Sequence, residues 1–404
     1  MKIIKNKIIL IPMLFCIAFQ TGCTVNINLN TEGSTGNFVS ADNASSLPRD
    51  DRLATVSARK VIREEEFGGI YIDLSIDDFN ALEFDYGDEV SIYFSNGYEL
   101  ENIPYYNGYY AKTGQPLLVG YPGYPYINAA LMDGDSLWTV ADMAEGDTAD
   151  ISLIKKGKYL DIQNARDIHY SDDRTLYSSD EVFANFRSVN AGNISKNILY
   201  RSASPCDNRF DRAKYVDRLM QEANVRFILD LADDKEKIQN YISGGDFHSP
   251  YFMSLYDEGY VIPMALDTNF ASAEFHEKLA CGLKDMIAHE GPYLVNCTEG
   301  KDRTGFVCML LEALCGASYD ELIDDYMITY ENYYGITKEN DPGKYEIIVS
   351  DVFLPRLQFI TGDNFDPTKA DLSKCAEEYL KSAGLTDSEI FEIKRKLIQN
   401  PSHK

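Results

Sequence analysis

The stretch that decides the fold is YLVNCTEGKDRTGFVCMLL, residues 293–311. Its apolar start, Tyr293–Val295, predicts a short buried strand, and its apolar end, Phe306–Leu311, predicts a helix. The polar residues between these two segments include Gly300, which predicts a tight loop. We therefore expect a strand, a tight loop and a helix start in direct succession.

The sequence on both sides of this stretch alternates between strand and helix patterns. Arg226–Leu231 predicts another short buried strand, and apolar residues at four-residue spacing over 275–287 predict a helix face. A Ser or Thr followed by Glu three positions later predicts two further helix starts, Ser318–Glu321 and Thr386–Glu389. Residues 181–400 are therefore expected to form an α/β domain with a central, mostly parallel sheet flanked by helices.

Residues 55–165 have a different pattern and predict a small all-β domain. Ile70, Ile72, Leu74 and Ile76 alternate with polar positions, as in a strand. Val90–Phe94 followed by Asn-Gly predicts a hairpin, because Asn-Gly supplies the positive φ angles of a type I′ turn. Residues 151–154 and 158–162 predict a second hairpin. This part resembles the β-barrel domain of the adenosylmethionine hydroxide adenosyltransferase and fluorinase group but lacks the catalytic motif of that group, so no chemistry is assigned to it.

The N-terminus predicts export. Three lysines precede an apolar run that ends at Gly22-Cys23, so residues 1–22 read as a signal peptide. The segment resembles a bacterial lipoprotein signal, which implies a lipid on Cys23 and anchoring to the outer face of the cell membrane. The sequence that follows is rich in Asn, Thr, Ser and Gly and predicts a flexible tether over residues 23–54. Plain secretion is the alternative, because Gln20 departs from the usual aliphatic residue.

Composition limits the partners. The net charge is −26 over 404 residues, and a protein this acidic lacks the basic surface that nucleic acid requires. The only contact with a membrane that we predict is made through the lipid on Cys23. The cysteines form no C-x-x-C pair and the five histidines are scattered, so neither a metal nor another cofactor is predicted.

The loop between the strand and the helix has the chemistry of a phosphate site. Five residues separate Cys297 from Arg303, which lets successive backbone N–H groups point inward at phosphate oxygens. Arg303 can hold two oxygens at once, and this positive environment favours the Cys297 thiolate as a nucleophile. Thr304 can donate its hydroxyl to that thiolate. The residues expected to bind substrate are Thr298, Glu299, Gly300, Lys301, Thr304 and Gly305.

This loop resembles the signature of cysteine-dependent protein tyrosine phosphatases, and Gly-Lys-Asp-Arg-Thr-Gly is most similar to the bacterial tyrosine/lipid-type branch. Asn185–Arg187, Leu199–Ser202 and Ile228–Leu231 resemble that branch's upstream segments. The resemblance implies a phosphocysteine intermediate, no metal, and substrates among phosphotyrosine, other phosphoresidues and phosphoinositides. Lys301 resembles the extra loop cation of lipid phosphatases, or is a solvated lysine at the rim.

The chain departs from the family at Asn296, where histidine is usual. Asparagine donates a hydrogen bond but brings no positive charge, so less of the neighbouring thiol should be ionised. We expect a slower but active enzyme, with a phosphate-binding pseudophosphatase as the alternative. A phytase-like inositol polyphosphate phosphatase on the same loop is a further alternative, whereas a rhodanese-type sulfurtransferase fits Arg303-Thr-Gly less well.

The general acid has several candidates. Asp302 ranks first because the resemblance places the proposed acid there. Asp267 ranks second because its distance in sequence from Cys297 is typical of the mobile acid loop in the wider group of cysteine-dependent phosphatases. A third group, Asp230, Asp233 and Asp234, lies at the end of a predicted strand. Two arginines, Arg187 and Arg201, either approach the substrate or tie segments together through buried ion pairs.

Overall fold

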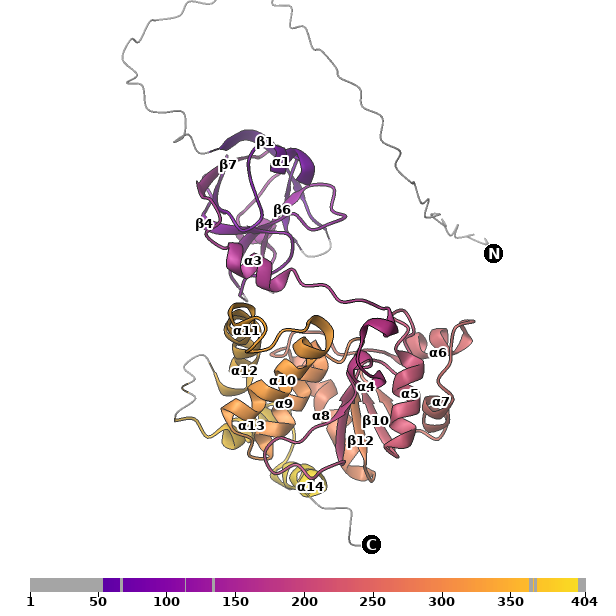
Figure 1. Cartoon of the computed structure of the whole chain (residues 1–404). Coiled ribbons are helices and arrows are strands. Elements are labelled where there is room, and N and C mark those ends of the chain that lie inside the picture. Colours follow the sequence, from indigo (N-terminus) through magenta and orange to yellow (C-terminus); the bar gives the residue numbers. More distant parts are fainter. Residues whose placement is uncertain are drawn as a thin grey trace, which may run out of the picture. The chain divides into compact units, whose positions relative to one another are not determined.

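An all-β region precedes an α/β region along the chain (Figure 1). The structure, a computed structural model, describes residues 54–398 apart from 66–67, 113, 133–134, 363–365 and 367–368. These described residues belong to one compact unit, Arg52–Lys404. The predicted signal peptide, Cys23 and all but the last residue of the tether lie outside them. None of the helices in these ranges is long and apolar enough to cross a membrane.

The first region is a closed barrel with the strand order β1-β2-β6-β5-β4-β3-β7. Its strands are β1 Thr55–Arg63, β2 Ile70–Ile72, β3 Glu89–Phe94, β4 Glu99–Tyr106, β5 Pro116–Val119, β6 Ile127–Leu131 and β7 Thr148–Lys155. Three short helices accompany them: α1 Ile76–Ala81, α2 Leu137–Val140 and α3 Leu160–Arg166. The barrel has its own apolar core, so the predicted all-β character is confirmed.

Two local predictions in the barrel have different outcomes. The hairpin at Asn96-Gly97 is confirmed, because β3 pairs with β4, but its turn is not of type I′. Gly97 has a φ of 90°, whereas Asn96 has no positive φ, and the Gly97 N–H donates to the Phe94 carbonyl. The second hairpin is wrong, because residues 160–166 form α3. Both edges of β7 are already paired, one with β1 and one with β3, and no edge remains for a further partner. Ile76 likewise starts α1 instead of continuing a strand, because Ser75 caps that helix by accepting from the Asp78 N–H.

The second region contains a five-stranded sheet in the order β11-β10-β12-β9-β8. Its strands are β8 Arg187–Ser188, β9 Leu199–Ser202, β10 Phe227–Asp230, β11 Val261–Pro263 and β12 Tyr293–Asn296. Neighbouring strands are parallel except for β8, which is antiparallel to β9 at the edge. The predicted mostly parallel sheet is therefore confirmed, and β12 lies at its centre.

Helices cover both faces of this sheet (Figure 1). The helices packed on one face are α5 Ala213–Glu222, α6 Lys235–Ser243 and α7 Pro250–Asp257. Those of the larger core on the other face are α8 Ala273–Ala288, α9 Asp302–Leu314, α10 Tyr319–Tyr334, α11 Pro342–Ile348, α12 Leu354–Thr361, α13 Leu372–Ser382 and α14 Asp387–Ile398, with the π-helical turn η2 Val349–Phe353. Two short helices, η1 Arg174–Leu176 and α4 Asp180–Phe183, precede β8. Both predicted capping boxes open helices.

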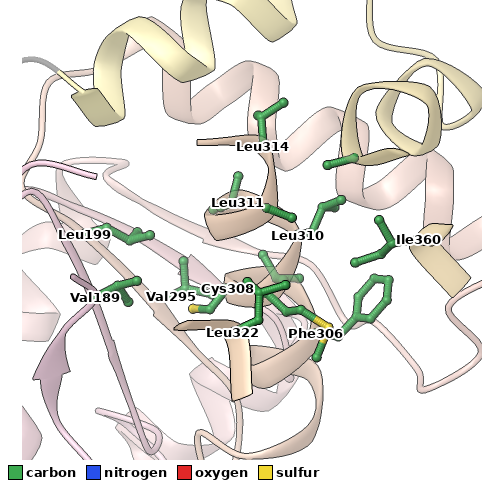
Figure 2. Close-up of a cluster of buried hydrophobic side chains, with 14 of the residues drawn as sticks. Val189, Leu199, Val295, Phe306, Cys308, Leu310, Leu311, Leu314, Leu322 and Ile360 are labelled. Carbon is green, nitrogen blue, oxygen red and sulfur yellow. The ribbon is translucent and has the colours of Figure 1, made fainter. Parts of the chain in front are cut away.

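Helix α9 runs through the middle of the larger core. Every residue from Thr304 to Leu314 is buried, and Figure 2 shows Phe306, Cys308 and Leu310 within the apolar cluster that Val295 and Leu199 of the sheet enter. A helix that is apolar on all sides must be enclosed by other elements. The loop that precedes α9 is therefore attached to a strand and a helix that are both fixed by packing.

Cys281, Cys308 and Cys315 lie in helical sequence patterns, which predict that all three are small core residues. Cys308 and Cys315 are buried, as expected, whereas Cys281 is exposed on α8. The four-residue spacing on α8 places Leu279 and Leu283 against the core, and Cys281 lies between them on the outer side. The cysteines of the described residues are all free thiols.

Candidate active site

The loop from Cys297 to Arg303 connects β12 to α9 at the carboxyl end of the sheet, where parallel sheets place their ligands. Cys297 is only 3% exposed. The Arg303 guanidinium lies across the loop, because one terminal nitrogen donates to the Thr298 hydroxyl at 3.2 Å and the other to the Leu266 carbonyl at 3.0 Å. The two ends of the loop are thus held together by a side chain of the loop itself.

Gly300 gives the loop its curvature. Its φ is +69°, a conformation that side chains disfavour. A Cβ atom at this position would lie 2.3 Å from the carbonyl oxygen of Ser202 in β9. Glycine is therefore required twice, once for the backbone angle and once for the close approach of the neighbouring strand.

The carbonyl groups of the loop point outward and are bound by side chains of other elements. The Gly300 carbonyl accepts from Asn185 Nδ2 and from Arg201 Nη2, each at 3.1 Å. The Glu299 carbonyl accepts from the Tyr333 hydroxyl at 2.7 Å. Because these carbonyls face outward, the N–H groups on the opposite edge of the same peptides face the inside of the loop.

Those N–H groups have no protein acceptor. Within the described residues, no carbonyl or side chain accepts from the backbone N–H groups of residues 298–301. The N-terminus of α9 adds further orphan N–H groups and the positive end of its dipole to the same place. The loop is therefore an anion-binding cradle next to a buried thiol.

A buried ion network supports the cradle from below. Asp325 of α10 pairs with Arg201 at 2.5 Å and with Arg187 at 3.1 Å. Burial opposes its ionisation, yet the two guanidinium groups hold its carboxyl pKa well below the usual range. Burial and the nearby Asp325 raise the pKa of Glu312, which favours its neutral form at the edge of the network. Of the two interpretations of Arg187 and Arg201, the structure favours the one in which they tie segments together.

Asn296 precedes the cysteine and faces the neighbouring strand. Its Nδ2 lies 3.3 Å from Asp230 Oδ1, opposite it in the β10–β12 pairing, and its Oδ1 is buried without a partner among the described residues. Burial first, and then the charge of Asp233, raise the pKa of Asp230 to about 7. The side-chain amide of Asn296 therefore donates to the Asp230 carboxyl group on the neighbouring strand.

The same carboxyl group belongs to a small cluster. Cys206, Asp230 and Asp233 lie with their polar atoms within 4.8 Å of one another, and they are the one group of metal-ligand type among the described residues. Burial raises the pKa of Asp233 as well, which makes its carboxyl group less suited to hold a cation, because metal ligands must be deprotonated. Asp234, the third member of the predicted acidic group, caps α6 by accepting from the Lys237 N–H.

The hydroxyl of Thr304 lies in the first turn of α9. It is buried and has no hydrogen-bond partner within the part of the chain that the structure describes. An unmet buried hydroxyl is costly, so its presence beside the loop is compatible with the predicted donation to a thiolate or a bound group.

Lys301 is not a solvated lysine. Its side chain is 21% exposed, and its Nζ lies 3.3 Å from both the Tyr334 hydroxyl and a Glu299 carboxylate oxygen. Glu299 also accepts from the Tyr170 hydroxyl at 2.7 Å. The Glu299 side chain therefore binds the neighbouring Lys301 and Tyr170 side chains. Glu299 contributes to an anion site only through its backbone N–H group.

Asp302, the first-ranked acid, is held as a carboxylate. Arg356 of α12 donates to its Oδ1 at 2.5 Å. Burial opposes ionisation, but Arg356 and Lys301 together lower the pKa of Asp302 to about 2. Such a group is ionised at neutral pH and is a poor proton donor.

Asp267, the second-ranked acid, has a different environment. It is exposed, and it accepts from the Asn269 N–H at 3.0 Å. The residue before it, Leu266, is the one whose carbonyl binds Arg303. Asp267 therefore follows directly after a backbone contact with the loop, and its carboxyl group is free to approach a bound substrate.

The sequence did not indicate several residues of the site. Arg356 lies 53 positions after Arg303, and no motif in the sequence marks it. Tyr333 and Tyr334 end a tyrosine-rich helix whose contacts depend on long-range packing. Asn185 had a signal, since it opens a segment resembling the phosphatase branch, but its role at the loop carbonyls becomes visible only in three dimensions.

A buried thiol, an arginine and an anion cradle at the end of a parallel sheet define a cysteine-based phosphatase domain. The model of the tyrosine phosphatase family matches residues 160–399. This match covers more than half of the chain, and the chain belongs to that family.

Two solved structures are similar to parts of the chain. The core catalytic domain of the PP-IP phosphatase SIW14 from S. cerevisiae shares 18% identity over 43% of this chain and 90% of that chain, with a TM-score of 0.25. An uncharacterized conserved protein from Thermotoga maritima shares 18% identity over 28% of this chain, with a TM-score of 0.21. The chain covers 41% of that second protein's length. No curated protein matches.

Proposed function

We propose that this protein hydrolyses phosphate monoesters through a phosphocysteine intermediate on Cys297, with phosphotyrosine-type and other phosphorylated compounds as substrates. The observation that carries the proposal is the cradle of unpaired N–H groups around a buried thiol. Phosphate oxygens would take those N–H groups and the Arg303 guanidinium, which places phosphorus above the Cys297 sulfur.

The first step transfers the phosphoryl group. The Cys297 thiolate attacks phosphorus, the S–P bond forms, and the ester P–O bond breaks. The leaving oxygen takes a proton from a carboxylic acid. In the second step water attacks phosphorus, the same carboxylate takes a proton from that water, and the S–P bond breaks. The Thr304 hydroxyl stabilises the thiolate as it leaves.

Asp267 is the proposed acid and base, in preference to Asp302. Its exposed carboxyl group lies in a segment that contacts Arg303, whereas Asp302 is engaged with Arg356. In this scheme Asp302 positions the start of α9 and the neighbouring cations. The proposal reverses the ranking that the sequence alone suggested.

The test measures phosphate release by the purified protein. The substrates are a phosphotyrosine peptide, a phosphoinositide and inositol hexakisphosphate, each with and without EDTA. Cys297→Ser is expected to abolish release while retaining phosphate binding, and the exposed Cys281→Ser is expected to behave as the wild type. If the wild type releases no phosphate from any substrate yet binds phosphate, the protein is a pseudophosphatase and the enzymatic proposal is wrong.

The location of the enzyme is a second part of the proposal. The support is the sequence of residues 1–23, a basic start and an apolar run before Gly22-Cys23. A lipid on Cys23 would anchor the enzyme to the outer face of the membrane. Cys23→Ala is then expected to move the protein from the membrane fraction to the soluble fraction of the cell envelope, whereas a wild-type protein already found in the soluble fraction would argue for plain secretion.

A further inference from the structure

A cavity of about 380 Å³ opens beside the outer side of the loop. Lys301, Asp302 and Arg356 line it from the phosphatase region, and Lys112 and Arg166 line it from the barrel and from α3. The barrel region meets the phosphatase region here because α3 contacts α11 and Ile168 packs against the larger core. Residues of the barrel region therefore form part of a wall beside the candidate active site.

The cavity is positively charged on a protein whose net charge is −26. Four cationic side chains line it, against the two carboxylates of Asp302 and Asp351. Asp302 is already paired with Arg356. Within the described residues, neither Lys112 nor Arg166 has a carboxylate at salt-bridge distance, so both charges are available to a ligand.

Arg166 is also held in place. Its guanidinium lies 5.2 Å from the centre of the Tyr110 ring, a contact that orients the group without neutralising it. The charge of Arg166 acts on Asp302 and on Tyr330, both of which line the cavity. Arg166 is half-buried and lines the cavity, so its charge lies beside any ligand bound there.

We propose that this cavity binds a second phosphate group of the substrate, and that Lys112 and Arg166 make the enzyme selective for small polyol phosphates with two or more phosphates. The proposal rests on the proposed function, since the first phosphate occupies the loop. One phosphotyrosine would leave Lys112 and Arg166 without an anionic partner, whereas a phosphorylated cyclitol presents phosphates on adjacent carbons. The cyclitol is either free or the headgroup of a lipid, because both carry the same chemistry.

The test compares two substrates of the full protein. Inositol hexakisphosphate carries several phosphates, and para-nitrophenyl phosphate carries one. In the double variant Lys112→Ala/Arg166→Ala, the ratio of kcat/KM for the first substrate to that for the second is expected to fall about tenfold or more, mainly through KM, because two charge-assisted contacts are lost. Lys60→Ala removes an exposed barrel cation that does not line the cavity and is expected to leave the ratio unchanged.

Further measurements separate the outcomes. Circular dichroism and thermal unfolding verify that the double variant is folded, and the single variants replace it if it is not. An unchanged ratio in folded variants overturns this inference while leaving the proposed function intact. Absence of turnover of both substrates by the wild type overturns the proposed function instead, and binding of inositol hexakisphosphate by Cys297→Ser then still tests the cavity. Vesicles containing a phosphatidylinositol bisphosphate, compared with its soluble headgroup, distinguish the two sources.

Discussion

Asn296 is the residue directly before the Cys297 thiol in the sequence, and its side chain determines how much charge this position brings to the thiol. Its Nδ2 donates to Asp230, and its Oδ1 has no partner among the described residues. A neutral amide in this place brings no charge toward Cys297. The charge that favours the thiolate must come from Arg303, from the loop N–H groups and from the dipole of α9.

Replacing Asn296 with histidine is expected to increase the thiolate. The imidazole would lie beside Asp230, whose carboxyl group can transfer its proton to the ring and then stabilise the imidazolium beside the thiol. We expect Asn296→His to raise turnover near pH 6 by up to about tenfold and to speed alkylation by iodoacetate at the same pH. Asn296→Ala is the control, because it removes the amide without adding charge. Equal alkylation rates in Asn296→His and the wild type across pH 5–8 would refute this account.

The two candidate acids can be separated by the leaving group. Asp267→Asn is expected to lower kcat for phenyl phosphate, which has a poor leaving group, by about 10²–10³, and to lower kcat for para-nitrophenyl phosphate much less. Asp302→Asn should affect both substrates alike, because it disturbs the position of Arg356 and Lys301 and not proton transfer. The reverse pattern would restore Asp302 as the acid.

At the scale of elements, the sequence predicted the parts of the site that are contiguous. The strand, loop and helix over residues 293–311 are encoded by neighbouring residues, and the buried character of α9 is visible in its continuous apolar sequence. The pairing partners are not local, which is why the helix α3 was mistaken for a strand. The support for the loop from Asn185, Arg201 and Tyr333 depends on strand order and helix packing. Neither can be deduced from the spacing of residues in the sequence.

The close approach of β9 to the loop predicts a specific cost for Gly300→Ala. The new Cβ would collide with the backbone of Ser202, and the residue would also keep an unfavourable φ. We expect a loss of about 2–4 kcal/mol in the free energy of unfolding together with loss of phosphate binding.

Gly335→Ala is the matched control for this prediction. Gly335 has a φ of +66°, and a Cβ atom there would meet nothing within 4 Å. It should therefore cost only the backbone term, about 1 kcal/mol, and leave phosphate binding intact. Urea unfolding and phosphate titration of the two variants measure both quantities, and equal effects at the two positions would show that the contact with β9 is unimportant.

At the scale of the whole molecule, the acidic chain places its buried and half-buried carboxyl groups in two opposite states. Asp325 and Asp302 are paired with arginines and remain ionised. Asp230 and Glu312 have raised pKa values because burial is not compensated by a pairing cation. The first kind stabilises the fold above the unfolded pKa of 3.8, and the second kind weakens it as the pH rises.

The loss of stability caused by a carboxyl group with a raised pKa can be measured at Asp230. Its pKa is about 7 in the folded protein against 3.8 as the ordinary value, so the folded state holds its proton more tightly. The contribution of Asp230 to the free energy of unfolding is therefore fully present below about pH 4 and is lost as the pH rises through 7. In Asp230→Asn the amide oxygen can still accept from Asn296, and its Nδ2 can donate toward Asp233, but nothing titrates. The free energy of unfolding of the variant relative to wild type should therefore improve by about 2–3 kcal/mol between pH 5 and pH 8. Asp285→Asn, an exposed change on α8, is expected to show no such difference, and a pH-independent effect of Asp230→Asn would mean that Asp230 is ionised in the folded protein.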